Sequence, residues 1–209
     1  MTGPDRFPAF LAQCPLIAII RGVTPEAAEA TGDALYEGGI RIIEVPLNSP
    51  RPLDSIALLR ARLGGRAMIG AGTVLDTQQV AAVRGAGGEL VVSPATDVEV
   101  IRATTAAGMV SCPGFFTPSE AFAAIGAGAH ALKLFPAEAA SPAVLKAMRA
   151  VLPAEVPVIV VGGVTPESMA PWLEAGAVGF GLGSGLYRPG QSPADTRARA
   201  ESYVQALGR

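Results

Sequence analysis

Cysteine, histidine and lysine are scarce in this 209-residue sequence. It contains two cysteines, Cys14 and Cys112, and one histidine, His130. The cysteines form no CxxC pair, so we expect neither a disulfide framework nor a zinc centre, and we assign no metal. We interpret both cysteines as small buried side chains in a reducing cytoplasm. We interpret His130, which precedes a predicted strand, as structural.

Charge and long apolar runs are also scarce. Charged residues make up 16% of the chain, and 16 basic against 18 acidic residues give a net charge of -2. A nucleic-acid-binding surface needs clustered positive charge, so we expect no nucleic-acid partner. No segment offers the roughly 18 consecutive apolar residues of a membrane helix, and the start lacks the basic-then-apolar pattern of a signal peptide. These features predict a cytoplasmic protein with no membrane partner.

The sequence is rich in apolar residues, which make up 50% of it, and its mean hydropathy is +0.40. That composition is the opposite of a disordered chain. Short apolar segments recur with a period of about 23 residues, which suits a strand-plus-helix repeat. The predicted strands are Leu16–Ile20, Ile42–Val45, Met68–Gly70, Leu90–Val92, Met109–Cys112, Ala131–Phe135, Val158–Val161 and Gly179–Leu182. Alanine-rich stretches between them predict helices over Pro25–Gly38, Thr77–Gly87, Ser119–Gly128 and Pro166–Gly176.

Helix-start signals support this alternation of strands and helices. A capping hydroxyl precedes a proline at Thr24-Pro25, Thr117-Pro118, Ser141-Pro142 and Thr165-Pro166. Eight strands alternating with helices predict a single (β/α)8 barrel domain over residues 1–209, with a short N-terminal helix over Asp5–Gln13 that closes its bottom. The alternative is a doubly wound open sheet. It is less well supported, because the first strand is not followed by G-x-G-x-x-G.

Lys133 is one of only two lysines, against 14 arginines, and it stands in the apolar segment Ala-Leu-Lys-Leu-Phe-Pro. Strand side chains alternate between two faces, and Leu132 and Leu134 suit the outer, helix-covered face. Lys133 would then face the barrel interior, where loss of hydration lowers its pKa. Such an amine can attack a carbonyl and form a Schiff base. The alternative is a lysine that points outward and pairs with a helix carboxylate.

Glu44 stands in a second apolar segment, Ile-Ile-Glu-Val-Pro. A carboxylate near a Schiff base can transfer protons, directly or through a water molecule. The alternative is a structural partner for Arg21 or Arg41. Both interpretations can hold together, because a salt bridge would orient the base.

Glycines follow the last two predicted strands, in Gly162-Gly163 and Gly183-Ser184. Backbone N–H groups and a helix N-terminus at these two loops form the usual phosphate site of such barrels. The alternative is a pair of tight turns without a ligand. Arg21, after the first strand, is either a clamp for a carboxylate or a surface arginine, and Thr73 can donate a hydroxyl to the same carboxylate.

Taken in chain order, these motifs resemble the KDPG/KHG aldolase family, which consists of small class I aldolases that cleave 2-keto-3-deoxy-6-phospho sugar acids. The resemblance covers nearly the whole chain. It is carried by Arg21-Gly22, Glu44-Val45-Pro46-Leu47, Gly70-Ala71-Gly72-Thr73-Val74, Ser93-Pro94, Cys112-Pro113-Gly114, Leu132-Lys133-Leu134-Phe135-Pro136, Gly162-Gly163-Val164 and Gly183-Ser184. It implies a (β/α)8 barrel that assembles as a homotrimer and uses neither cofactor nor metal.

The resemblance also implies a role for each matching residue. Lys133 matches the Schiff-base lysine and Glu44 the proton-transfer glutamate. The substrate is expected to be a phosphorylated keto-deoxy sugar acid, with pyruvate as one product. Substrate-binding roles are implied for Arg21 and Thr73 at the carboxylate, for Gly162, Gly163, Gly183 and Ser184 at the phosphate, and for Pro94 and Phe135 along the pocket.

Asn48 and Val161 depart from the branch of the family that acts on the gluconate epimer. That branch tends to carry a Thr-Arg-Thr-type sequence where Asn48 lies, and a threonine where Val161 lies. The sequence here looks like the branch that cleaves the galactonate epimer to pyruvate and glyceraldehyde 3-phosphate. Valine in place of threonine removes a hydrogen-bond partner for a substrate hydroxyl, while Asn48 can supply one elsewhere.

Other functions stay open on the sequence alone. The first is the same chemistry on the gluconate epimer or on 4-hydroxy-2-oxoglutarate. The second is a phosphosugar isomerase or epimerase that uses Glu44 without a Schiff base. The third is a phosphosugar-binding protein without activity, which is disfavoured because both Lys133 and Glu44 are present.

Overall fold

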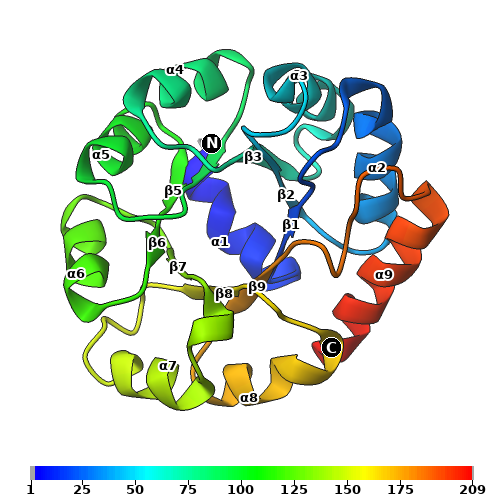
Figure 1. Cartoon of the computed structure of the whole chain (residues 1–209). Helices are drawn as coiled ribbons and strands as arrows, with labels where there is room; N and C mark the ends of the chain where they lie inside the picture. The colour runs from blue at the N-terminus through cyan, green and yellow to red at the C-terminus, as the bar shows by residue number, and fades with distance from the viewer. Residues whose placement is uncertain (1–2, 209) are drawn as a thin grey trace.

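A curved parallel sheet forms the centre of the molecule and helices surround it (Figure 1). The computed structural model describes residues 3–208. The sheet order is β5-β4-β3-β2-β1-β9-β8-β7-β6, so the strands follow one another around a barrel-like sheet in which β1 lies beside β9. This order excludes the doubly wound alternative. The strands are β1 (Leu16–Ile19), β2 (Ile42–Pro46), β3 (Met68–Gly72), β4 (Leu90–Val92), β5 (Val110–Cys112), β6 (Gly114–Phe115), β7 (Leu132–Leu134), β8 (Val158–Val161) and β9 (Gly179–Leu182).

The helices lie mainly on the outside of the sheet. Each predicted alanine-rich stretch holds helix, but the last is divided into a 3₁₀ turn and a short α-helix. The α-helices are α1 (Gly3–Gln13), α2 (Pro25–Glu37), α3 (Pro52–Leu63), α4 (Thr77–Gly85), α5 (Val98–Ala106), α6 (Pro118–Gly126), α7 (Pro142–Arg149), α8 (Met169–Glu174) and α9 (Pro193–Ala206). The 3₁₀ turns are η1 (Ala137–Ala139) and η2 (Pro166–Ser168). Within residues 3–208, none of these helices is long and apolar enough to cross a membrane.

The hydroxyl caps form at some of the predicted helix starts. Thr117 and Ser141 accept hydrogen bonds from backbone N–H groups in the first turns of α6 and α7. The prediction was wrong at Thr24, which makes no such bond. Pro25 still begins α2, because its fixed φ suits the first helical position.

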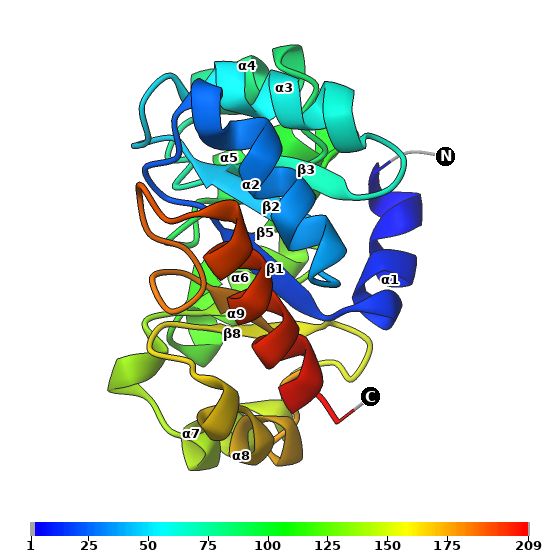
Figure 2. The same ribbon diagram turned by 90° about the vertical axis from the view of Figure 1, so that its right-hand side faces the viewer.

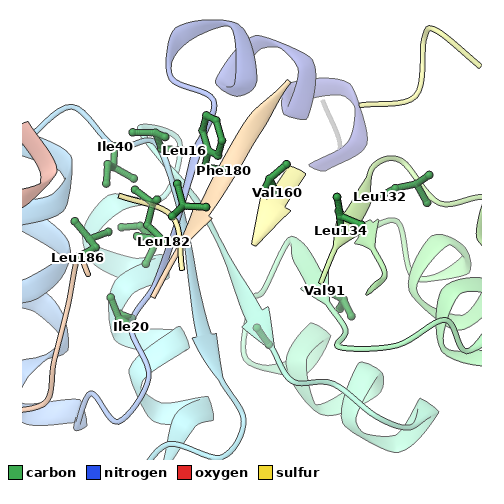
Figure 3. Close-up of a cluster of buried hydrophobic side chains, with 14 of the residues drawn as sticks. Leu16, Ile20, Ile40, Val91, Leu132, Leu134, Val160, Phe180, Leu182 and Leu186 are labelled. Carbon is green, nitrogen blue, oxygen red and sulfur yellow. The ribbon is translucent and has the colours of Figure 1, made fainter. Parts of the chain in front are cut away.

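Two apolar clusters divide the core. The inner cluster fills the barrel and joins inward strand residues such as Ile17, Ile42 and Met68 to Phe7 and Phe10 of α1. Helix α1 lies across one end of the barrel, as the side view shows (Figure 2). The outer cluster lies between strands and helices (Figure 3) and includes Leu16, Val91, Leu132, Leu134, Val160, Phe180 and Leu182.

Strand alternation between these clusters settles the orientation of the two candidate catalytic side chains. Leu132 and Leu134 belong to the outer cluster, so Lys133 between them faces inward. Glu44 has the same parity as Ile42, which belongs to the inner cluster, and also faces inward. The prediction that Lys133 points into the barrel is therefore confirmed.

The scarce residues noted above have packing roles. Cys14 and Cys112 are buried and form no disulfide. The Nδ1 atom of His130 accepts a hydrogen bond from the Ser111 N–H (3.1 Å), which ties the start of β7 to β5. Among residues 3–208, no group of three or more His, Cys, Asp or Glu side chains is placed to hold a metal ion.

Close packing of α2 on α3 gives a test of the outer cluster. Leu59 is fully buried, and a Cβ built on Gly32 of α2 would lie 2.4 Å from its Cδ2 atom. Leu59→Ala should lower the free energy of unfolding by about 2–5 kcal/mol, because it leaves a cavity. Its neighbour Leu58 is 37% exposed, and Leu58→Ala should cost less than about 1 kcal/mol. Urea denaturation would measure both, and equal losses would contradict this packing.

Candidate active site

A cavity of about 640 Å³ lies at the carboxyl ends of the strands. This is the end of the barrel opposite α1, and it is where barrel enzymes place their active sites. Every strand of the barrel except β5 and β6 delivers a lining residue, from the strand itself or from the loop after it. The residues that line the cavity include Arg21, Glu44, Thr73, Pro94, Lys133, Phe135, Glu138, Val161, Gly162, Gly163, Gly183, Ser184, Tyr187, Arg188 and Pro189.

Nearly all the residues singled out in the sequence lie together in this cavity. The exception is Asn48, which is exposed and is not part of the lining. Its Oδ1 atom accepts a hydrogen bond from Arg21 Nη1. The role of Asn48 in substrate binding therefore stays a prediction, and its amide N–H2 group can still donate a hydrogen bond. Its contact with the cavity lining is this bond to Arg21.

Glu44 is the most deeply buried charged side chain of the cavity, with 2% of its surface exposed. It lies on β2, level with Ile19 of β1 and Gly70 of β3. Its Oε2 atom is buried and has no hydrogen-bond partner. Burial raises the pKa of Glu44 to about 7, against the opposing effect of Lys133 and Arg21. A carboxyl with this pKa can accept and return a proton near neutral pH.

Lys133 is 7% exposed and lies on β7, paired with Gly114 of β6 and Ile159 of β8. Its Nζ atom lies 4.5 Å from the centroid of the Phe135 ring. Burial lowers the pKa of Lys133, Glu44 and Cys112 oppose that shift, and Arg21 adds to it. The lowered pKa increases the fraction of neutral, nucleophilic amine at a given pH.

Cys112 faces inward beside these two groups. Burial raises its pKa to about 12, so the thiol keeps its proton at neutral pH. It therefore contributes volume to the barrel interior and no thiolate nucleophile.

Gly72, at the end of β3, makes room for the Glu44 carboxylate. A Cβ at this position would lie 2.0 Å from Glu44 Oε2 and 2.3 Å from Oε1. Any larger residue would therefore push the carboxylate out of its place. Thr73, the next residue and part of the lining, has a left-handed φ of 56°, which is uncommon outside glycine.

The loops after β8 and β9 carry the predicted phosphate-binding residues. Gly162 and Gly163 have φ values of 118° and 63°, which only glycine adopts readily. After β9, the Gly183 carbonyl accepts bonds from the N–H groups of Leu186 and Tyr187, and this single turn ends well before α9 begins. The helix N-terminus expected at this loop is therefore limited to one turn.

Glu138 and Arg188 also line the cavity, and neither was predicted as a site residue. Glu138 lies in η1, with its Oε2 atom 2.0 Å from where a Cβ of Gly162 would be. Arg188 lies in the loop after β9. A usable signal was available for both, since each follows a strand carboxyl end by only a few residues.

A sequence profile described as KDPG and KHG aldolase matches residues 8–196. The chain belongs to the KDPG and KHG aldolase family. Within this family it is 49% identical to the 2-dehydro-3-deoxy-6-phosphogalactonate aldolase of Escherichia coli (strain K12), over 92% of this chain and 94% of that protein. It is 32% identical to the KHG/KDPG aldolase of the same organism, over 79% of this chain and 77% of that protein.

Solved structures give the same relationship for the fold. A structure described as "Native KDPGal structure" superimposes with a TM-score of 0.92 at 48% identity, covering 94% of this chain and 95% of that one. The 2-keto-3-deoxy-6-phosphogluconate aldolase of Zymomonas mobilis ATCC 29191 superimposes with a TM-score of 0.84 at 26% identity, with coverage of 94% and 95%. The barrel is therefore shared by aldolases named for both epimers.

The raised pKa of Glu44 has a consequence for stability. The folded protein keeps the Glu44 proton up to about pH 7, whereas the unfolded chain releases it near 4.5. The native state therefore binds more protons between these values, and stability falls as the pH rises through this window. Relative to Glu44→Gln, the wild type should lose roughly 2–3 kcal/mol between pH 5 and pH 8. Urea denaturation at both pH values measures this, and a difference that does not change with pH would contradict it.

Proposed function

We propose that this protein is a class I aldolase that cleaves 2-dehydro-3-deoxy-6-phosphogalactonate to pyruvate and glyceraldehyde 3-phosphate. The observation that carries the proposal is the pair of buried charged groups, Lys133 and Glu44, facing one cavity from β7 and β2. The 49% and 48% identities to proteins named for this substrate, in Escherichia coli and Rhizobium meliloti, support the choice of epimer.

The proposed reaction begins at Lys133. Its neutral amine attacks the C2 ketone and, after loss of water, forms an iminium ion. The iminium takes up the electron pair of the C3–C4 bond as that bond breaks, which leaves an enamine on the lysine. Glu44 takes the proton of the C4 hydroxyl, through a water molecule, and the C4 fragment leaves as the aldehyde. Glu44 then returns a proton to C3 of the enamine, and hydrolysis frees pyruvate. No metal or cofactor takes part in this scheme.

Binding of the substrate is proposed to use the two ends of the cavity. Arg21, held by Asn48, and Thr73 hold the carboxylate, since a guanidinium forms strong paired bonds with this group. Gly162, Gly163, Gly183 and Ser184 hold the phosphate through backbone N–H groups, and the open space at Gly183 supports this. Between the two ends, Pro94, Phe135 and Val161 line the path along which the carbon chain would lie.

The eightfold barrel expected for the family is part of the proposal. We count β5 and β6 as one strand interrupted at Pro113, which turns nine strands into eight. Hydrogen bonds from the chain at β7 support this, because they reach both sides of the interruption. The His130 N–H donates to the Ser111 carbonyl (2.9 Å), and the Lys133 N–H donates to the Pro113 carbonyl (2.8 Å). One continuous segment therefore bonds to β4 on one side and to β7 on the other. We also propose that the chain forms a single barrel domain and that α1 closes one end of it.

We also propose a homotrimer in the cytoplasm. Large apolar side chains remain exposed in the single chain, among them Leu75 (56%), Phe122 (47%) and Phe116 (36%). Such residues are common at subunit interfaces. A protein cage described as designed by fusing symmetric oligomeric domains contains a chain that is 48% identical to this one, over 93% of this chain and 72% of that one.

Borohydride reduction in the presence of pyruvate tests the Schiff base. The wild type should gain the mass of one reduced pyruvate on Lys133 and lose activity, because the reduced bond cannot hydrolyse. Lys133→Met should gain no mass and lose at least about 10³-fold in kcat. Lys146→Met is the matched control, because Lys146 is exposed on α7, and should trap normally. Turnover without any adduct would indicate an isomerase or epimerase that uses Glu44 alone.

The ratio of kcat/KM on the two C4 epimers tests the substrate. We expect the galactonate epimer to be preferred, because Val161 offers no hydrogen bond to a hydroxyl placed for a threonine. Val161→Thr should shift the ratio toward the gluconate epimer by roughly 10-fold or more. Val160→Thr is the control, since Val160 faces the outer cluster. Equal rates on both epimers, or an unchanged ratio in Val161→Thr, would contradict this assignment and leave the Schiff base untouched.

A further inference from the structure

Positive charge in the cavity is supplied by three side chains: Arg21, Lys133 and Arg188. The proposed function uses Arg21 for the carboxylate and Lys133 for the Schiff base, which leaves Arg188 without a role. The proposed phosphate site consists of neutral backbone N–H groups and one hydroxyl. A phosphate dianion held there would lack a full counter-charge.

The Arg188 side chain is exposed and makes one hydrogen bond beside this site. Its Nε atom donates to the Ser184 carbonyl (3.1 Å), four residues earlier in the chain. No other hydrogen bond or ion pair of this side chain is found within residues 3–208. Its two terminal nitrogens therefore remain able to donate to a ligand at Ser184, and a guanidinium presents such donors in a planar fork that matches phosphate oxygens.

The loop that carries Arg188 is itself anchored. The Gln191 side chain donates to the Leu186 carbonyl (2.9 Å) and to the Thr196 hydroxyl (3.0 Å). Pro189 packs against Gly22, where an added Cβ would lie 2.7 Å from the proline Cγ atom. The loop thus contacts both the chain after β1 and the start of α9, and these contacts position the backbone of Arg188 beside the site before any ligand binds.

Glu138 increases the need for a cation at this end of the cavity. Its carboxylate lies against Gly162, and its Cγ atom is 2.8 Å from where a Cβ of Gly163 would be. A negative charge beside the glycine N–H groups opposes the binding of an anion there. A nearby cation with two free donors offsets this repulsion.

We propose that Arg188 is a phosphate-binding residue of this site, and that it sets the preference for phosphorylated over non-phosphorylated keto-deoxy sugar acids. This inference rests on the proposed function, because it takes the phosphorylated substrate from there. Arg188 would add a charged side chain to a phosphate site that otherwise consists of backbone N–H groups and one hydroxyl. It also gives the loop between β9 and α9 a part in substrate choice.

The test compares Arg188→Gln with the wild type on 2-dehydro-3-deoxy-6-phosphogalactonate and on the same acid without phosphate. KM for the phosphorylated substrate should rise roughly 10- to 100-fold, the usual effect of losing hydrogen bonds to a charged group. kcat/KM for the unphosphorylated acid should stay within about twofold, because that acid has no group for Arg188 to bind. Arg188→Lys should restore part of the loss through its charge.

Arg199→Gln is the matched control. Arg199 also donates to a carbonyl of this segment, that of Gly185 (2.8 Å), but it does not line the cavity. It should leave the ratio of kcat/KM between the two substrates unchanged. Equal losses on both substrates in Arg188→Gln would overturn the inference, because they would show a purely structural role through Ser184. An unchanged KM for the phosphorylated substrate would overturn it as well.

Binding of inorganic phosphate separates this inference from the proposed function. Calorimetric titration of the wild type and of Arg188→Gln with phosphate needs no turnover. The affinity should fall by a similar roughly 10- to 100-fold factor in the variant and stay unchanged in Arg199→Gln. If the wild type cleaved neither acid, the proposed function would fail while this comparison still decided the role of Arg188. Equal phosphate affinity in all three proteins would overturn the inference.

Discussion

Burial of Lys133 and Glu44 inside an apolar barrel is the constraint on which the site depends. Both groups lose most of their hydration, and burying a charge is expensive unless it is neutralised or paired. Burial therefore favours the uncharged form of each group: it raises the pKa of Glu44 to about 7 and lowers the pKa of Lys133. The same desolvation that opposes folding thus raises the fraction of neutral amine at Lys133 and gives Glu44 a pKa at which it can exchange a proton near neutral pH.

The rest of the barrel keeps that desolvation in place while leaving space for a reaction. Toward α1, large side chains such as Met68 and Phe10 fill the interior. Toward the carboxyl ends, glycines replace them. A Cβ at Gly72 would collide with Glu44, and one at Gly181 would lie 2.7 Å from a Val161 methyl group. One end is therefore packed and the other hollow, and the charged pair lies where the packing gives way to the cavity.

Much of this arrangement was predictable because strand alternation is a local property. The leucines on either side of Lys133 were enough to turn it inward, and strand-end positions placed nearly all of the other site residues in the cavity. Contacts between distant loops were not predictable in this way. The bond from Arg21 to Asn48 joins residues 27 apart, and the place of Glu138 beside Gly162 depends on how η1 packs. The strand predicted over Met109–Cys112 stops before Pro113, so the pairing of Gly114–Phe115 with β7 was not foreseen.

The distribution of charge also bears on the proposal that an uncharged residue, Val161, chooses between epimers. If charged groups fix the carboxylate and the phosphate at the two ends of the substrate, its carbon chain has little freedom to shift between them. A C4 hydroxyl of the wrong configuration must then meet whatever side chain lies at mid-cavity. Val161, which is 6% exposed, offers that hydroxyl no hydrogen bond. An unsatisfied buried hydroxyl costs about 1–3 kcal/mol, which corresponds to roughly 5- to 150-fold in kcat/KM. For the Val161 side chain to distinguish the two epimers, the substrate must therefore be held at both its carboxylate and its phosphate.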